Sequence, residues 1–199
     1  LQERANRFFY GERYDLRQGL LDFGRTLSAT TAMEPLMDAL TERLMQVLDV
    51  EKVAVFVEDK TTPSRFRQAK AIGLSDDFNI PPDFRHLIRQ KSADTGVVRA
   101  DQFGTPDADP ADQNGNGNGR VPVRQELHYF VPCVVRSKMV AVVGLGRAKD
   151  GSLLSSEDLE ILRTVSRYIA VAIENSRLYE EQQAQTEEVA LLKEFNESI

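Results

Sequence analysis

YFVPCVVRSKMVAVVGLG, residues Tyr129–Gly146, contains two apolar runs rich in Val, separated by the polar pair Ser137-Lys138. β-branched and aromatic residues favour extended strands, and a short polar break between two such runs is typical of a hairpin turn. We therefore predict two antiparallel strands, Glu126–Arg136 and Met139–Arg147, joined by a tight turn at Ser137-Lys138.

A second hairpin is predicted upstream. Lys52–Glu58 (KVAVFVE) is dense in Val and Phe and too short for a typical helix, and Phe66–Ile72 forms another strand-like run that ends at Gly73. The alternation of side chains leaves open which residues of the first strand face which side of a sheet. Either Val53, Val55 and Val57 or Ala54 and Phe56 can point towards a pocket.

Helices are predicted before and after the hairpin that spans Lys52–Ile72. Thr31–Glu34 has the pattern of a capping box, in which two side chains satisfy the free amides at a helix start. The helix that follows has an apolar face made of Met33, Leu36, Met37, Leu40, Leu44 and Leu48. Further along, Asp83–Lys91 is predicted to be a helix after Pro81-Pro82, and Ala93–Gly96 is expected to cap another short one. Residues 104–120 have almost no apolar side chain, so we expect a flexible loop there.

The last helix is predicted to begin with a second capping box, Ser155–Asp158, and to continue to the end of the sequence. It has two stripes of regularly spaced residues, and the second contains Asn and Gln as well as apolar side chains. One is suited to packing on a sheet and consists of Leu159, Leu162, Val165, Ile169, Ala172 and Ile173. The other repeats every 3.5 residues, as a coiled coil requires, and runs from Ile161 and Tyr168 through Leu178, Val189 and Leu192 to Ile199. Two faces imply two partners, which we expect to be the chain's own sheet and a second copy of the chain.

The N-terminal residues carry a similar seam with alternating three- and four-residue spacing. Combined with the C-terminal seam, it predicts a homodimer formed through the terminal helices. The residues expected to contribute to this dimer are Phe9, Leu16, Leu20, Phe23, Leu27, Ile161, Tyr168, Leu178, Val189 and Leu192.

The order of these elements, and two stretches in particular, resembles the GAF domain family. Tyr129–Gly146 is similar to the family's apolar strand with a proline, its basic turn and its return strand ending in glycine. Leu154–Leu159 and Ile169–Glu181 (IAVAIENSRLYEE) are similar to the family's closing helix. The resemblance implies an α+β fold in which an antiparallel sheet has the terminal helices on one face and a ligand-type pocket under variable helices and loops on the other. It also implies three parts: residues 1–30 as a signalling and dimerisation helix, 31–178 as the domain, and 179–199 as a coiled-coil linker to a further module.

The resemblance further implies that such a pocket holds a small molecule. Aromatic side chains would supply apolar walls, and His86 and Arg89, one helical turn apart, would suit an anionic group. For any one residue, a solvated helix with a hydrophobic underside is the competing interpretation. The candidate ligand-binding residues are Phe56, Phe84, His86, Arg89, Phe103, His128, Phe130 and Cys133. The sequence identifies no cofactor, and only Asp158 matches the motif of the family's cyclic-nucleotide binders.

Composition excludes several other classes. The net charge of −6, without a cluster of basic residues, argues against nucleic-acid binding. No apolar run approaches the roughly 20 residues of a membrane-spanning helix, so we expect no membrane contact. The single Cys rules out an intrachain disulfide and suits the cytoplasm, and two distant His residues are weak evidence for a metal site, so none is expected.

No phosphate-binding loop or catalytic triad order is present, so an enzyme is not expected. The chain starts without Met and ends within a helical pattern, which suggests a fragment of a larger signalling protein such as a sensor histidine kinase. The sequence thus predicts a sensory module that binds a small molecule and signals through dimeric helices. The alternative is a purely structural dimerisation domain whose pocket is collapsed.

Overall fold

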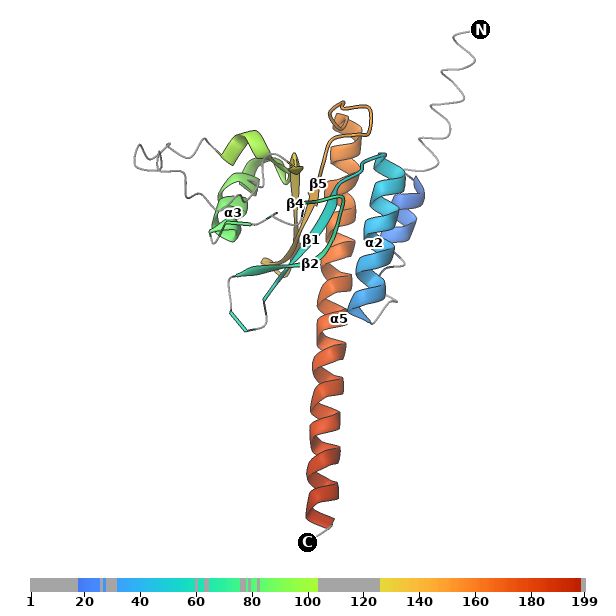
Figure 1. Cartoon of the computed structure of the whole chain (residues 1–199), viewed down its shortest axis with the longest axis vertical. Helices are drawn as coiled ribbons and strands as arrows, with labels where there is room; N and C mark the ends of the chain where they lie inside the picture. Colours follow the sequence, from blue (N-terminus) through green and yellow to red (C-terminus); the bar gives the residue numbers. More distant parts are fainter. Residues whose placement is uncertain are drawn as a thin grey trace.

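The computed structural model describes residues 18–25, 27, 32–59, 61–62, 65–75, 78, 80–81, 83–103 and 126–197. These residues form three layers, with a central sheet between helix α3 on one face and helices α2 and α5 on the other (Figure 1). The predicted α+β class, with an antiparallel sheet and terminal helices on one face, is confirmed. No helix in this part of the chain is both long enough and apolar enough to cross a membrane.

The sheet has five strands in the order β2-β1-β5-β4-β3, and every neighbouring pair is antiparallel. Both predicted hairpins are present, as β1–β2 and β4–β5, and the short β3 was not predicted. The strands are β1 (Val53–Glu58), β2 (Phe66–Ile72), β3 (Val98–Arg99), β4 (Tyr129–Val135) and β5 (Lys138–Leu145).

The turn between β4 and β5 differs from the prediction by one residue. Its two central residues are Arg136 and Ser137, both with positive φ (49° and 63°), and Lys138 is already the first residue of β5. Two-residue hairpin turns with this geometry normally carry Gly or Asn. Because neither is present here, the sequence located the turn only approximately.

The two faces of the sheet are now distinguished. Val53, Val55 and Val57 of β1 lie in the core cluster under α2 and α5, whereas Ala54 and Phe56 lie in a second cluster under α3. The alternation left open by the sequence is thereby settled, with Phe56 on the α3 side.

Helix α2 (Met33–Leu48) packs against β1 and β2. Five of its six predicted core residues are buried and Met33 is partly buried. Its N-cap is Ala32, which makes no side-chain capping bond, so the expected capping box at Thr31 is not the cap of this helix. Thr31 itself lies outside the described residues.

Helix α3 (Phe84–Thr95) is followed by Gly96 in the left-handed conformation (φ 68°). Ala93–Gly96 therefore ends this helix, and the expectation that it caps a further one is wrong. The chain continues directly into β3 and a 3-10 turn, η2 (Ala100–Phe103).

Helix α5 (Ser156–Glu197) begins with the predicted capping box. The amide of Asp158 donates to Oγ of Ser155 (3.1 Å), and the amide of Ser155 donates to Oδ2 of Asp158 (3.0 Å). The predicted sheet-facing residues Leu162, Val165, Ile169, Ala172 and Ile173 are all buried, and Leu159 packs against the same cluster. From residue 181 to residue 196 every side chain is exposed, and the helix projects away from the domain (Figure 1).

Residues 18–25 are helical and complete this core. Leu20 is 0% exposed and Leu27 is 2% exposed within the chain's own cluster. The prediction that these two side chains face a second copy is therefore wrong, because they have no free surface to offer. Phe23 packs partly against the same cluster, and Phe9 and Leu16 lie outside the described residues.

Candidate functional site

Three of the predicted ligand-binding residues meet on the α3 side of the sheet. Phe84 of α3 contacts Phe56 of β1 and Phe130 of β4, with ring centroids 5.4 and 5.5 Å apart in edge-to-face geometry. All three rings are buried. The structure thus brings these residues together, but as an aromatic cluster whose members contact one another.

His86 and Arg89 do not join this cluster. Helix α3 turns Phe84 and Ile88 towards the sheet, and one-turn spacing places both on its inner face. His86 and Arg89 are exposed on the outer face. Their predicted role as pocket-lining residues is corrected by this orientation.

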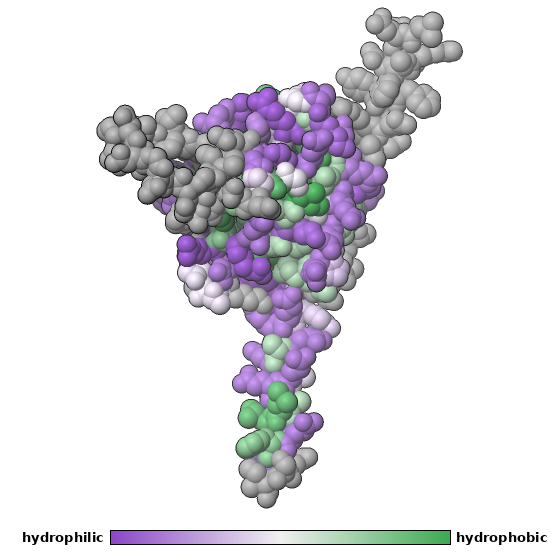
Figure 2. Space-filling view, viewed as in Figure 1, coloured by the Kyte–Doolittle hydropathy of each residue, from purple (hydrophilic) through white to green (hydrophobic). Residues whose placement is uncertain are grey.

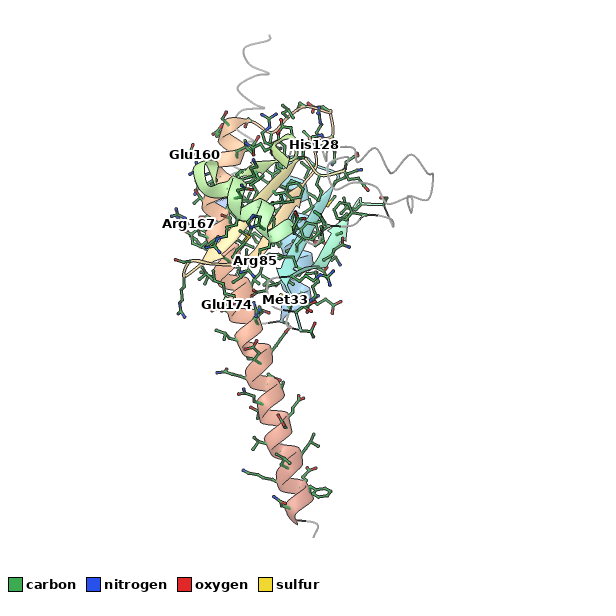
Figure 3. All side chains as sticks on the ribbon, turned by 90° about the vertical axis from the view of Figure 1, so that its left-hand side faces the viewer. Met33, Arg85, His128, Glu160, Arg167 and Glu174 are labelled. Carbon is green, nitrogen blue, oxygen red and sulfur yellow. The ribbon has the colours of Figure 1, made fainter. Side chains whose placement is uncertain are left out.

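His128 lies just before β4, at the opposite end of the domain from Arg85 (Figure 3). Its Nε2 accepts a hydrogen bond from Nε of Arg147 (2.8 Å), and its buried Nδ1 has no partner among the described residues. Burial, followed by the charges of Arg147 and Lys52, lowers the pKa of His128. The ring is therefore neutral at pH 7 and is separated from the pocket described below.

Cys133 lies on the other face of the sheet. It alternates with Phe130 so that its side chain packs in the cluster under α5, together with Tyr129 and Val131. Burial raises the pKa of its thiol to about 12. The assignment of Cys133 to a ligand pocket on the α3 side is therefore wrong. Phe103 ends η2, and its side chain lies outside the described part of the structure.

A pocket of about 200 Å³ opens at the rim of the α3 layer, where β1 ends and where β2 and α3 begin. Of the residues predicted from sequence, only Phe84 lines it. The lining residues are Asp59, Arg65, Phe66, Ile80, Pro81, Phe84 and Arg85. They come from three separate segments, so no local spacing in the sequence connects them.

Beside this pocket, the buried carboxylate of Glu58 gathers three cations. Its Oε1 accepts from Arg85 of α3 (2.6 Å), and its Oε2 lies 2.8 Å from Nζ of Lys138 and 3.4 Å from Arg177 of α5. Burial by itself raises the pKa of Glu58, but the hydrogen bonds and charges of Lys138 and Arg85 outweigh it and lower the pKa to about 2. Glu58 therefore stays ionised and connects helices on opposite faces of the sheet.

The C-terminal part of the predicted seam is open to solvent. Leu178, Val189 and Leu192 are 50%, 53% and 59% exposed, and Leu191 and Phe195 add to the apolar surface. Figure 2 shows hydrophobic side chains gathered on the projecting part of α5. At the other end of the seam, Ile161 packs against the chain's own core and Tyr168 is half covered, with its ring against Gly24.

Comparisons with known proteins agree with this architecture. The family profile described as GAF domain matches residues 32–175. No curated protein matches the sequence.

Among the described residues, no group of three or more His, Cys, Asp or Glu side chains is arranged to hold a metal ion.

The chain is also similar in fold to several solved GAF domains. The GAF domain of a phosphoenolpyruvate-protein phosphotransferase from Coxiella burnetii is 13% identical with a TM-score of 0.56, over 85% of this chain and 96% of that one. The GAF domain assigned to a sensor histidine kinase from Pseudomonas syringae pv. tomato is 15% identical with a TM-score of 0.54, over 93% and 99%. A GAF domain/HD domain protein from Geobacter sulfurreducens is 20% identical with a TM-score of 0.50, over 76% and 98%.

Proposed function

Because this chain belongs to the GAF domain family, we propose that it is a non-catalytic regulatory module that binds a small molecule and relays its presence through α5 to an output module. The proposed module works as a homodimer in the cytoplasm and binds neither nucleic acid nor membrane. Proteins of similar fold include domains from a sensor histidine kinase and a chemotaxis protein, and both names support a signalling role.

One observation carries this proposal: a single continuous helix is both part of the domain core and the only described element that leaves the domain. Its first half buries Leu162 and Ile169 against the sheet, and its last residues project into solvent. At 1.5 Å per residue its 42 residues span about 63 Å. A movement of the sheet or of α3 would therefore be carried rigidly along α5.

The exposed apolar seam supports a second copy as the partner. An isolated helix that exposes Leu178, Val189 and Leu192 leaves apolar surface in water, whereas pairing the same seam across a dimer would bury it. Two packings of this helix pair with similar free energies would supply the two states that a relay needs.

Sedimentation analysis tests the dimer. We expect a dimer for the unchanged chain and a monomer for the double variant Val189→Glu and Leu192→Glu, because two buried charges per helix would oppose pairing. The matched control is Gln183→Glu with Ala190→Glu, which adds the same charge on the opposite side of the helix and should leave the dimer intact. A monomeric unchanged chain, or a dimer that survives the seam variant, would contradict the proposal.

Native mass spectrometry of the purified protein, combined with an absorption scan, tests ligand binding. We expect a bound small molecule or a visible absorption band. The alternative function, a structural dimerisation domain, is favoured by the aromatic cluster of Phe56, Phe84 and Phe130, which fills space on the face where a ligand pocket was expected. A dimer with no bound molecule under any condition would support that alternative.

A further inference from the structure

The rim pocket has the charge and shape to hold a small anion. Two arginines, Arg65 and Arg85, line it together with one carboxylate, Asp59. That carboxylate is already engaged, since its Oδ1 accepts bonds from the amide and the hydroxyl of Thr61 (2.8 and 2.7 Å). The carboxylate keeps its charge, but two guanidinium groups against one carboxylate leave the lining with an excess of positive charge.

The remaining walls of the pocket are apolar, and two of them are aromatic rings against which a flat molecule can pack. The rings of Phe66 and Phe84 stand edge to face with centroids 6.3 Å apart, and Ile80 and Pro81 complete the lining. A volume of about 200 Å³ lies below the range of roughly 300–1,000 Å³ that drug-sized ligands occupy. A planar ring bearing one carboxylate satisfies both the size and the charge.

Arg85 belongs to the pocket and to the Glu58 network at the same time. Its guanidinium donates to Oε1 of Glu58 and lies 5.8 Å from the centre of the Phe66 ring. A carboxylate in the pocket would compete with Glu58 for this guanidinium, because the planar group pairs strongly with either carboxylate.

On its other side Glu58 reaches α5 at the last turn that contacts the domain. Arg177 is largely covered, Ser176 is fully buried, and Leu178 is already half exposed. The Arg177–Glu58 contact is long at 3.4 Å, and Nε of Arg177 and Oε2 of Glu174 have no hydrogen-bond partner among the described residues. Figure 3 shows Arg85 and Glu174 at the end of the domain where α5 leaves it. The Nε–H group of Arg177 is therefore still available as a donor to a carboxylate that moves closer.

We propose that the rim pocket binds a small planar carboxylate which takes Arg85 from Glu58, and that Glu58 then tightens its contact with Arg177 of α5. The inference rests on the proposed function and supplies its ligand class and its first relay step. Coupling of this kind is reciprocal, so a change in Glu58 or Arg177 must alter ligand affinity even though neither residue lines the pocket.

Fluorine NMR titration with para-fluorobenzoate tests the ligand class. We expect saturable binding to the full chain, and no binding of the neutral para-fluorobenzamide or of para-fluorobenzylamine at the same concentrations. Binding of the amide as tight as that of the carboxylate, preference for the amine, or no binding of the carboxylate would overturn the proposal.

Variants test the exchange itself. Arg85→Gln should weaken para-fluorobenzoate binding by on the order of tenfold, because a charge-assisted bond is lost. Glu58→Gln should strengthen binding several-fold, because the competitor for Arg85 is gone. Arg177→Gln should weaken it several-fold, since Glu58 then holds Arg85 more firmly. The control is Arg89→Gln, on the same helix but exposed and outside the pocket, which should leave affinity unchanged.

The variants also guard against a folding artefact. If Glu58→Gln does not fold, Arg177→Gln still tests the relay step. An affinity of Arg177→Gln for para-fluorobenzoate equal to that of the unchanged chain would overturn that step. Amide hydrogen exchange around Arg177 gives an independent readout: it should slow when para-fluorobenzoate is added to the unchanged chain, and no change would overturn the relay step.

The two proposals fail in different ways. A dimer that carries some other small molecule, with no affinity for para-fluorobenzoate, would refute this ligand class and leave the sensory function standing. A monomer that binds para-fluorobenzoate through Arg85 would refute the dimeric relay and leave the pocket assignment standing.

Discussion

The backbone amide of Leu154 donates a buried hydrogen bond to the phenolic oxygen of Tyr129 at 3.1 Å. This bond ties β4 to the segment that leads into α5, one residue before the capping box at Ser155. Both residues are buried, so water cannot replace the partner that either would lose. The starting point of the long helix is therefore fixed by a side chain of the sheet as well as by its own cap.

Replacement of Tyr129 by Phe should lower the free energy of unfolding by about 1–2 kcal/mol, because the amide of Leu154 is left buried and unsatisfied. Urea denaturation followed by circular dichroism measures the change. Tyr179→Phe is the control, since its hydroxyl only pairs with Gln183 on the exposed part of α5 and its loss should cost less than about 0.5 kcal/mol. Equal effects of the two variants would mean that the buried bond contributes nothing special.

The regular elements were predictable because their signals are local. Val-rich runs predicted three of the five strands, and the run Phe66–Ile72 before Gly73 predicted a fourth. The spacing of Leu162, Val165 and Ile169 identified the face of α5 that packs on the sheet. Ser155 and Asp158 sit three residues apart in the sequence, so their capping bonds followed from the pattern alone. The two-residue strand β3 has no comparable signal.

The candidate site was less predictable because it depends on tertiary contacts. The pocket is lined by three segments, which contribute Asp59, Phe66 and Arg85 among others. The spacing of these residues in the sequence does not predict that they lie close together. For His86 and Arg89, the one-turn spacing was real, but the sequence did not show which face of α3 turns inward. The spacing of Leu20 and its neighbours is compatible with a dimer interface or with an intrachain core. In the structure Leu20 is buried in the intrachain core.

Replacement of Gly73 by Ala should destabilise the protein by about 2–4 kcal/mol. Gly73 has a φ of +74°, and a Cβ there would collide with the backbone oxygen of Glu51. Both backbone strain and a rigid clash therefore contribute. Thermal or urea denaturation measures the loss.

Gly151→Ala is the matched control for that substitution. Gly151 has a similar φ of +80°, but apart from its two chain neighbours no atom of the described residues lies within 4 Å of the position that a Cβ would occupy. This variant should lose only the strain of about 1 kcal/mol. If Gly73→Ala were no worse than Gly151→Ala, the contact with Glu51 would not matter.

The thiol of Cys133 should be inert in the folded protein. It is fully buried, and burial raises its pKa to about 12, so at pH 8 almost no thiolate exists to react. Ellman's reagent should label the native protein slowly, at the rate of unfolding. In guanidinium chloride it should rapidly label the single thiol that each chain contains. Rapid labelling of the native state would show that the sheet opens at β4.

Acid should remove the stabilisation that Glu58 provides. Its folded-state pKa of about 2 lies below the ordinary value of 4.5, so the stabilisation is complete above pH 4.5 and is lost progressively as the pH falls towards 2. At about 1.4 kcal/mol per pKa unit, the effect amounts to about 3 kcal/mol. We expect the difference in unfolding free energy between the unchanged chain and Glu58→Gln to be largest at pH 7 and to shrink by pH 3. Glu160→Gln, at an exposed site on α5, should show no such convergence, and a Glu58→Gln difference that is constant with pH would mean that the carboxylate gains nothing from its three cations.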